Sequence, residues 1–153
     1  MDDGSRLPFF CAVLLLFCAM YFAVAETSFA SASRTRLRLA EDRGDSRAKR
    51  ALYVLDHFDL AINTILIGTN IVHVSAAALV TLGVTRRWGL GAVSVSTLIT
   101  TGVVFFAGEM LPKSIAKKYS DKLALSTAGA LVFFMRLFRP LSGLSREFPR
   151  FHR

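Results

Sequence analysis

One segment of the sequence combines a proline, a glycine and a carboxylate in an arrangement that suits cation binding. Pro112 has no N–H, so in an α-helix the carbonyl four residues earlier, that of Gly108, loses its donor. Glu109 lies beside that carbonyl, and carboxylate and carbonyl oxygens are the ligands of hard cations such as Mg²⁺. The spacing predicts a helix kinked at Pro112 with an oxygen-rich site. An ordinary helix end, with Glu109 paired to Lys113, is the alternative.

Other polar side chains lie in or beside apolar stretches, where each is costly in a membrane and therefore informative. Asn70 and His73 are one helical turn apart. Each could belong to a functional site, and the alternative is that each makes hydrogen bonds between helices. Thr27 and Ser28 follow the first apolar stretch, where their hydroxyls could face the same cavity as Glu109 or bond to helix carbonyls. The sequence contains no nucleophile–base pair, thiolate metal site or phosphate loop, so we expect no enzyme.

The elements that must position these residues are three apolar blocks, at residues 7–25, 60–84 and 88–108. Each is close to the roughly 20 residues that cross a bilayer, and 53% of the chain is hydrophobic. The fold class expected is therefore an all-α integral membrane protein with three transmembrane helices. A further run at 123–135 is short for a span and predicts a C-terminal amphipathic, juxtamembrane helix. A cleaved signal peptide is disfavoured, because the first residues are acidic.

The net charge of +8 comes from Lys and Arg placed between and after the apolar blocks. This placement indicates contact with anionic lipid headgroups and argues against nucleic acid. The basic stretch 31–51 contains Gly44 and Asp45, a turn signal that predicts a cytosolic helical hairpin at the membrane surface. The positive-inside rule then places the N-terminus outside and the C-terminus in the cytoplasm of a multi-pass protein in the cell membrane. Cys11 and Cys18 are expected to be packing residues.

Three motifs in order carry a resemblance to a known family. They read ETSFASASRTRL at 26–37, ILIGTNIV at 65–72 and GEMLPK at 108–113. Together they resemble the transmembrane domain of the cyclin M/CorC (CNNM-type) family, and the match runs from about residue 7 to residue 140. The domain expected is therefore 1–140, followed by a basic cytosolic tail at 141–153.

The resemblance implies a homodimer that transports or exports divalent cations, Mg²⁺ above all, with Na⁺ as a proposed coupling ion. It implies that Asn70, Gly108 and Glu109 are metal ligands and that Pro112 forms a helix kink. The family's serine ligand has no counterpart here, because Tyr21–Ala25 offers no side-chain oxygen suited to that role. Backbone carbonyls, Thr27 or Ser28 are the candidate substitutes.

Members of this family typically continue into a paired cystathionine-β-synthase-type module that binds ATP. The sequence ends at Arg153 without such a pair, so we expect no ATP site in this chain, and cytosolic regulatory domains could be supplied by another chain. A natural short form and a truncated chain both stay open. Two rival functions also stay open: a Mg²⁺-binding membrane sensor or scaffold without transport, and a membrane-active, hemolysin-like protein.

Overall fold

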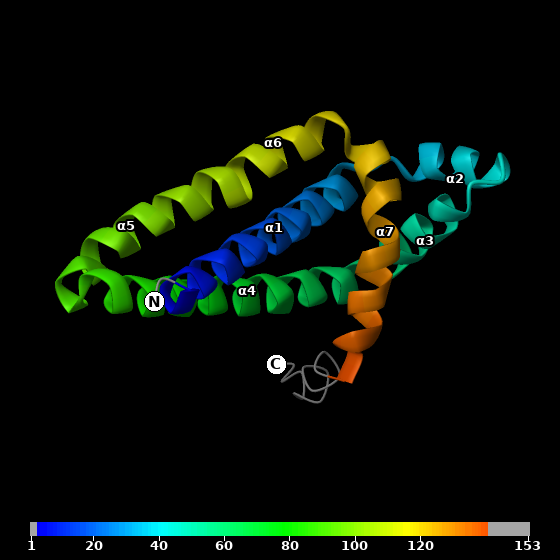
Figure 1. The fold of residues 1–153 in the computed structure, drawn as a ribbon. Coiled ribbons are helices and arrows are strands. Elements are labelled where there is room, and N and C mark those ends of the chain that lie inside the picture. The colour runs from blue at the N-terminus through cyan, green and yellow to red at the C-terminus, as the bar shows by residue number, and fades with distance from the viewer. Residues whose placement is uncertain (1–2, 141–153) are drawn as a thin grey trace, which may run out of the picture. The chain divides into compact units, whose positions relative to one another are not determined.

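The protein is built from helices joined by short connections (Figure 1). The computed structural model describes residues 3–140, and this part of the chain contains no strand. In chain order the elements are α1 (Asp3–Ser31), α2 (Arg34–Asp42), α3 (Ser46–Asp56), α4 (Phe58–Trp88), the 3₁₀ turn η1 (Leu90–Ala92), α5 (Val93–Val103), the π-helical η2 (Val104–Met110), α6 (Leu111–Lys118) and α7 (Ser120–Leu137). The predicted basic tail at 141–153 lies outside the described residues.

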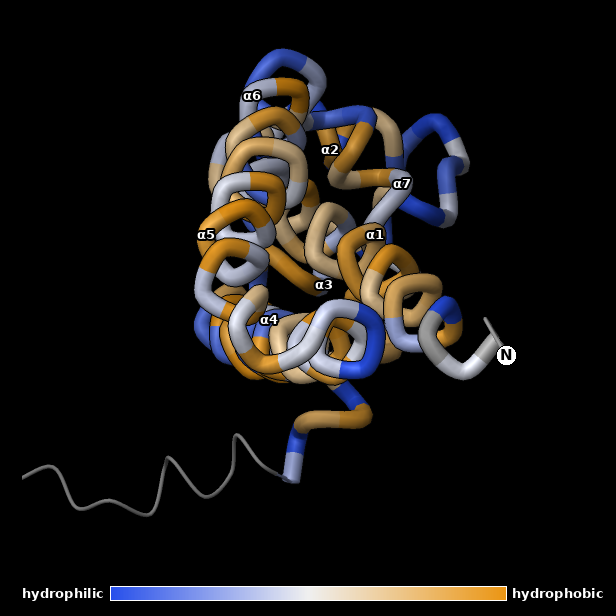
Figure 2. Tube along the Cα trace, turned by 60° about the vertical axis from the view of Figure 1, so that its left-hand side comes forward, coloured by the Kyte–Doolittle hydropathy of each residue, from blue (hydrophilic) through white to orange (hydrophobic). Residues whose placement is uncertain are grey.

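Three helical stretches are long and apolar enough to cross a membrane, as the sequence predicts. They are Arg6–Ser31, Phe58–Trp88 and Leu90–Lys118, and the last joins η1, α5, η2 and α6 into one third span. Figure 2 shows the hydrophobic residues running along α1, α4 and α5. The chain is therefore an all-α, multi-pass membrane protein.

The third span continues well beyond the apolar block that predicted it. Glu109 lies inside this continuous helical stretch and not at its end. The pairing of Glu109 with Lys113, which the alternative also included, stays a prediction. The second span is also longer than expected and includes Arg86 and Trp88. The connection that follows is tight, because Gly89 adopts a positive φ of 84°, a conformation that glycine reaches without strain.

The chain divides into two compact units. Unit 1 contains the residues up to Val24 together with Gly68–Lys118, and unit 2 contains Ala25–Ile67 together with the residues from Tyr119 onward. The long helices α1 and α4 each contribute to both units. Unit 1 holds the carboxylate of the predicted site.

Close packing in unit 1 depends on glycines that receive large side chains of α1. A Cβ added to Gly68 would lie 2.5 Å from Cζ of Phe22, and one added to Gly108 would lie 3.1 Å from Cδ1 of Leu16. Small residues at such contacts let membrane helices approach closely. The glycines therefore leave room for side chains of α1 against α4 and against the third span.

A hydrogen bond joins the start of α1 to the end of α4, and its acceptor is a carbonyl that Pro8 leaves without a helical donor. Pro8 lies inside α1 and has no N–H to offer the carbonyl of Gly4. That carbonyl accepts a hydrogen bond of 3.0 Å from Nη1 of Arg86. Nearby, the rings of Phe9 and Trp88 meet edge to face at 6.2 Å.

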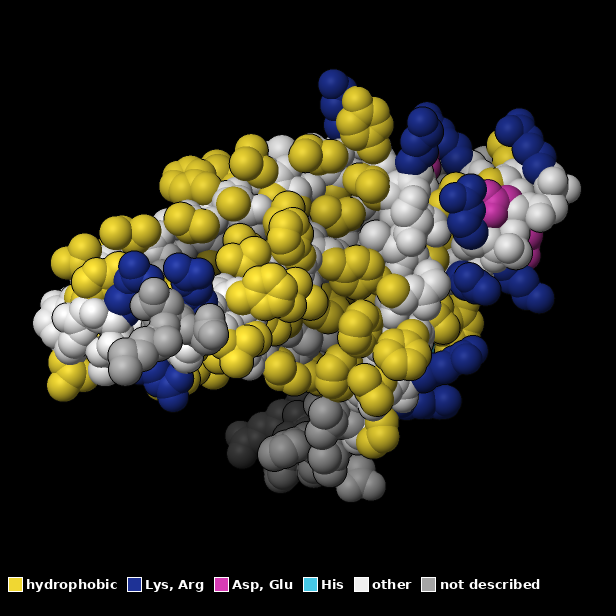
Figure 3. All heavy atoms as spheres, viewed as in Figure 1, with side chains coloured by type: hydrophobic (Ala, Val, Ile, Leu, Met, Phe, Trp, Pro, Cys, Tyr) yellow, Lys and Arg dark blue, Asp and Glu magenta, His cyan; other side chains and the backbone are white. Residues whose placement is uncertain are grey.

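Unit 2 contains the predicted helical hairpin, formed by α2 and α3. Gly44 turns the chain between them with a φ of 89°, and the Asp45 side chain caps α3 by accepting from the backbone N–H of Arg47. Small residues on α3 pack against the buried face of α7: Ala48, Ala51 and Val54 on α3 and Ala124, Ala128 and Leu131 on α7. Figure 3 shows Lys and Arg side chains gathered over this hairpin.

The beginning of α7 is bonded to the start of α2 and to the residue before it. The carboxylate of Asp121 accepts a hydrogen bond of 2.9 Å from the backbone N–H of Ser33 and pairs with Arg36 at 3.0 Å. The apolar run predicted at 123–135 thus forms part of α7, which is not among the three candidate spans.

Candidate cation site

The third span changes its hydrogen-bond register directly before Pro112. Over Val104–Met110 the helix is π-helical, and the N–H of Leu111 donates to the carbonyl of Phe106, five residues earlier. Pro112 explains this widening, because its ring clashes with the carbonyl four residues before it and a wider turn relieves the clash. The break predicted from the sequence is therefore a π-helical segment.

The π-helical register affects which backbone oxygens lack a donor. In a four-residue register the carbonyl that lacks a donor because of Pro112 is that of Gly108, as the sequence predicts. In the five-residue register the carbonyl without a donor is that of Ala107. Both carbonyls flank the break, and Gly108 itself is buried. That the Gly108 carbonyl is a free ligand stays a prediction.

Glu109 extends from this segment toward the second span and meets His73. Its Oε1 lies 3.5 Å from Nε2 of the imidazole, and the two side chains are 32% and 31% exposed. This separation exceeds the usual N–H···O hydrogen-bond length of about 2.7–3.2 Å. Nε2 of His73 is buried and has no hydrogen-bond partner.

A cavity of about 280 Å³ opens beside this pair. Four of the residues that line it have polar side chains: His73 from α4, Thr100 and Thr101 from α5, and Glu109 from η2. Thr101 donates its hydroxyl hydrogen to the carbonyl of Thr97 at 2.7 Å, which leaves the oxygen able to accept or ligate. The cavity therefore has room for a hydrated ion and offers oxygen and nitrogen ligands.

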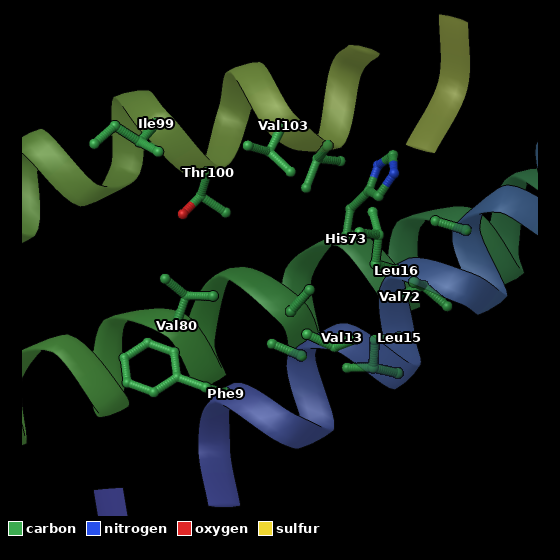
Figure 4. A pocket seen from close by; sticks show the side chains of 14 residues that line it. Phe9, Val13, Leu15, Leu16, Val72, His73, Val80, Ile99, Thr100 and Val103 are labelled. Carbon is green, nitrogen blue, oxygen red and sulfur yellow. The ribbon is translucent and has the colours of Figure 1, made fainter. Parts of the chain in front are cut away.

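A second cavity, of about 210 Å³, adjoins the first and is almost wholly apolar. Figure 4 shows Phe9 and Leu16 of α1, Val80 of α4 and Val103 of α5 around it, with His73 rising from α4 toward the third span. His73 lines both cavities, as do Ala76, Thr100 and Val104, so the apolar space adjoins the one that contains Glu109.

The structure brings together only part of the predicted ligand set. Asn70 is an exposed residue of α4 and is not among the residues that line the cavity beside Glu109. Thr27 and Ser28 belong to unit 2 and are buried there at 8% and 0% exposure, with the Ser28 hydroxyl lacking a hydrogen-bond partner. Their roles as ligands stay predictions.

Sequence reasoning did not include His73, Thr100 and Thr101 in the site. The sequence predicts that His73 makes contacts between helices, and it does make one, to Glu109. The two threonines lie eight and nine residues before Glu109, a spacing that in a regular α-helix places Thr100 on the opposite face, so the sequence carries no signal for them. The wider turns of Val104–Met110 lie between the threonines and Glu109 and alter that rotation. Among the residues that the structure describes, His, Cys, Asp and Glu form no group of three or more that could hold a metal ion.

The charged groups of unit 2 are paired differently from Glu109. The guanidinium of Arg34 beside Asp56 holds the pKa of that carboxyl below its usual range, and Arg47 does the same for the pKa of Asp45. These pairs are exposed and lie outside the spans, where they organise the hairpin rather than a membrane site.

Comparison with protein families identifies a match over most of the chain. Residues 10–148 match the cyclin M transmembrane N-terminal domain. The match covers most of the first span, the second and third spans, and the hairpin between the first two.

Similar proteins occur in bacteria. A UPF0053 protein of Haemophilus influenzae is 30% identical over 142 residues, which cover 93% of this chain and 34% of that protein. The UPF0053 inner membrane protein YfjD of Escherichia coli is 35% identical over 130 residues, covering 85% of this chain and 30% of that protein. A polyamine export protein of Haemophilus influenzae is 26% identical over 142 residues, covering 84% and 33%. The chain thus spans about a third of the length of these relatives.

Proposed function

The chain belongs to the family of cyclin M transmembrane N-terminal domains, and from this membership we propose that it moves a divalent cation, Mg²⁺, across the membrane. Its three candidate spans and its likeness to an inner membrane protein make it a multi-pass membrane protein. The name of a third relative, a polyamine export protein, supports a role in transport.

The observation that carries this proposal is the position of Glu109. A carboxylate inside a span is costly unless it has a counter-charge or a function. Glu109 lies in the π-helical break of the third span and faces a cavity with two threonines and an imidazole. A cation that enters this cavity would supply the counter-charge.

The remaining ligands follow from the family resemblance. We propose that the side chain of Asn70 and the carbonyl of Gly108 join Glu109 as ligands. Mg²⁺ prefers six oxygen ligands and usually keeps several waters, so few protein oxygens are needed. The 280 Å³ cavity has space for such waters.

We propose alternating access as the transport mechanism, with Na⁺ as the coupling ion. The π-helical segment gives the third span a position where its backbone bonds are already altered, so helix movement there breaks few further bonds. Movement about Gly108 and Pro112 would expose the cation first to one side of the membrane and then to the other.

We further propose a homodimer with its N-terminus outside and its C-terminus in the cytoplasm. None of the membrane window of the third span is buried within the chain. A second copy could cover part of this surface, and lipid would cover the rest. Purified protein should accordingly have the mass of two chains in multi-angle light scattering.

An organic cation is the second candidate cargo, and a specific pair of observations favours it. One relative is named a polyamine export protein, and the cavity that adjoins the one beside Glu109 is apolar. An aliphatic diamine would place one ammonium against Glu109 and its methylene groups in the apolar space. Mg²⁺ makes no use of that second cavity.

Flux into proteoliposomes tests the proposed function and separates it from its rivals. Purified protein would be reconstituted with a Mg²⁺-sensitive dye inside, and a labelled diamine would be offered in parallel. We expect Mg²⁺ influx that exceeds that of protein-free vesicles. Saturable Mg²⁺ binding without flux would instead indicate a sensor or scaffold, and release of a large trapped dye would indicate a hemolysin-like activity.

A further inference from the structure

We infer that His73 is a direct ligand of imidazole-preferring divalent ions, such as Zn²⁺ and Co²⁺, at the proposed cation site and makes that site bind them more tightly than Mg²⁺. This inference rests on the proposed function, because it concerns the selectivity of the same site. It adds a nitrogen ligand from the second span to the carboxylate of the third.

The distance between the two side chains is the first support. Nitrogen and oxygen ligands lie about 2.0–2.2 Å from Zn²⁺ and take tetrahedral positions around it. Two such ligands are about 3.4 Å apart, as simple trigonometry of that geometry requires. Nε2 of His73 and Oε1 of Glu109 are 3.5 Å apart. The pair is therefore too far apart for a good hydrogen bond and correctly spaced for a shared metal ion.

The state of the imidazole nitrogen is the second support. Nε2 of His73 is buried and has no hydrogen-bond partner, which is a costly condition for a polar atom inside a protein. A metal ion would satisfy this nitrogen. Because His73 and Glu109 come from different helices, a shared ion would also join α4 to the third span.

The cavity beside the pair can complete the coordination. Thr100 and Thr101 line it together with His73 and Glu109, and its 280 Å³ admits water. Two protein ligands with water and hydroxyl oxygens would hold an ion less tightly than a closed structural site does. Weaker binding is what a transported ion requires, since it must also leave.

The type of ligand decides the selectivity. Mg²⁺ is bound by oxygen, whereas imidazole is a good ligand for Zn²⁺, Co²⁺ and Ni²⁺. A site made only of Asn70, Gly108 and Glu109 would offer oxygen alone. With His73 as a ligand, the same site gains affinity for the late transition ions and gains nothing for Mg²⁺.

The test is to measure Zn²⁺ and Mg²⁺ binding to the full chain in lipid nanodiscs by titration calorimetry. The variants are His73→Asn and His73→Gln, which keep a polar side chain, with His57→Asn as the matched control. His57 lies at the end of α3 in unit 2, outside the spans. Loss of a residue that only supports a metal ligand costs about 10–100-fold in affinity, so loss of the ligand itself should weaken Zn²⁺ binding at least tenfold. Mg²⁺ binding should be unchanged, and the His57 variant should match the wild type.

Co²⁺ gives an independent readout, because its visible absorption reports the atoms that bind it. We expect the bands of bound Co²⁺ to change when His73 is replaced and to persist when His57 is replaced. Unaltered Zn²⁺ binding in both His73 variants would overturn the inference. An equal loss of Zn²⁺ and Mg²⁺ affinity would also overturn it, because it would indicate that His73 only positions Glu109. Failure of the proposed function can be distinguished from failure of this inference. If the protein shows no flux but its Zn²⁺ binding still depends on His73, transport is contradicted and the metal site is retained.

Discussion

At the scale of single residues, the carboxylates of this protein differ in the partners that the structure gives them. Asp56 and Asp45 lie on the hairpin and pair with Arg34 and Arg47. Glu109 lies inside a span and faces His73, which carries a charge only when it is protonated. An arginine would neutralise the carboxylate permanently, whereas a histidine leaves it available to a cation. This difference is the residue-level reason for placing cation binding at Glu109.

The hairpin pairs give a prediction about pH. Since the hydrogen bond from Arg34 lowers the pKa of Asp56 in the folded protein, the pair stabilises the fold at pH values above about 4 and that contribution is lost as the pH falls further. Replacing Arg34 by Gln should raise the pKa of Asp56 back toward about 3.9. Carbon-detected NMR titration of the aspartate carboxyls measures this. An Arg47→Gln control should move Asp45 alone, and an unmoved Asp56 in the Arg34 variant would contradict the pairing.

At the scale of elements, the break in the third span is the feature that matters most for function. Its position is predictable, because Pro112 must disturb the helix over the preceding turn. Its π-helical form is not, because a proline can also be accommodated by a simple kink, and packing decides between the two. Here Gly108 lets Leu16 of α1 lie close to the widened turn. The pairing of His73 with Glu109 depends on the rotation of α4 against the third span, which no local pattern encodes.

Replacing Pro112 by Ala tests whether the break serves transport. The restored N–H should let the segment return to an α-helical register and stabilise the protein by up to about 3 kcal/mol, while flux falls. Thermal unfolding and proteoliposome flux measure the two effects. Pro8→Ala, at the other proline within a span, should leave flux near the wild-type value. Full flux in the Pro112 variant would count against movement at this position.

The glycine contacts of unit 1 give a prediction about helix packing. Gly68→Ala would force a Cβ to within 2.5 Å of the Phe22 ring, which is 4% exposed and has little room to move. Overpacking of this kind costs about 1–3 kcal/mol, so the unfolding temperature should drop. Gly102→Ala is the matched control, because nothing lies within 4 Å of its added Cβ. Equal stability of the two variants would show that α1 does not pack on Gly68 as described.

At the scale of the whole molecule, composition and patterning predict the class and the number of spans. The apolar blocks are long enough to predict three membrane-spanning helices. Gly44 and Asp45 predict the hairpin turn at its correct position. Block ends are less predictable, because helices extend past the apolar residues into polar ones such as Arg86 and Lys118. The orientation in the membrane follows from the charges alone and stays a prediction.

Cysteine accessibility tests that orientation. In a background with Cys11 and Cys18 replaced by serine, one variant would carry Gly91→Cys in the connection after α4 and another Ser46→Cys in the hairpin; both positions are exposed. The positive-inside rule predicts that a membrane-impermeant maleimide added to intact cells labels the first variant and not the second. The reverse pattern would require the hairpin and the C-terminus to lie outside.

The most direct test of the account is Mg²⁺ flux into proteoliposomes by the wild type, Glu109→Gln and Glu41→Gln. The two variants remove the same charge, one in the π-helical break of the third span and one on the exposed hairpin helix α2. We expect flux to disappear in the Glu109 variant and to match the wild type in the Glu41 variant. Undiminished flux without the carboxylate of Glu109 would contradict its placement on the ion path.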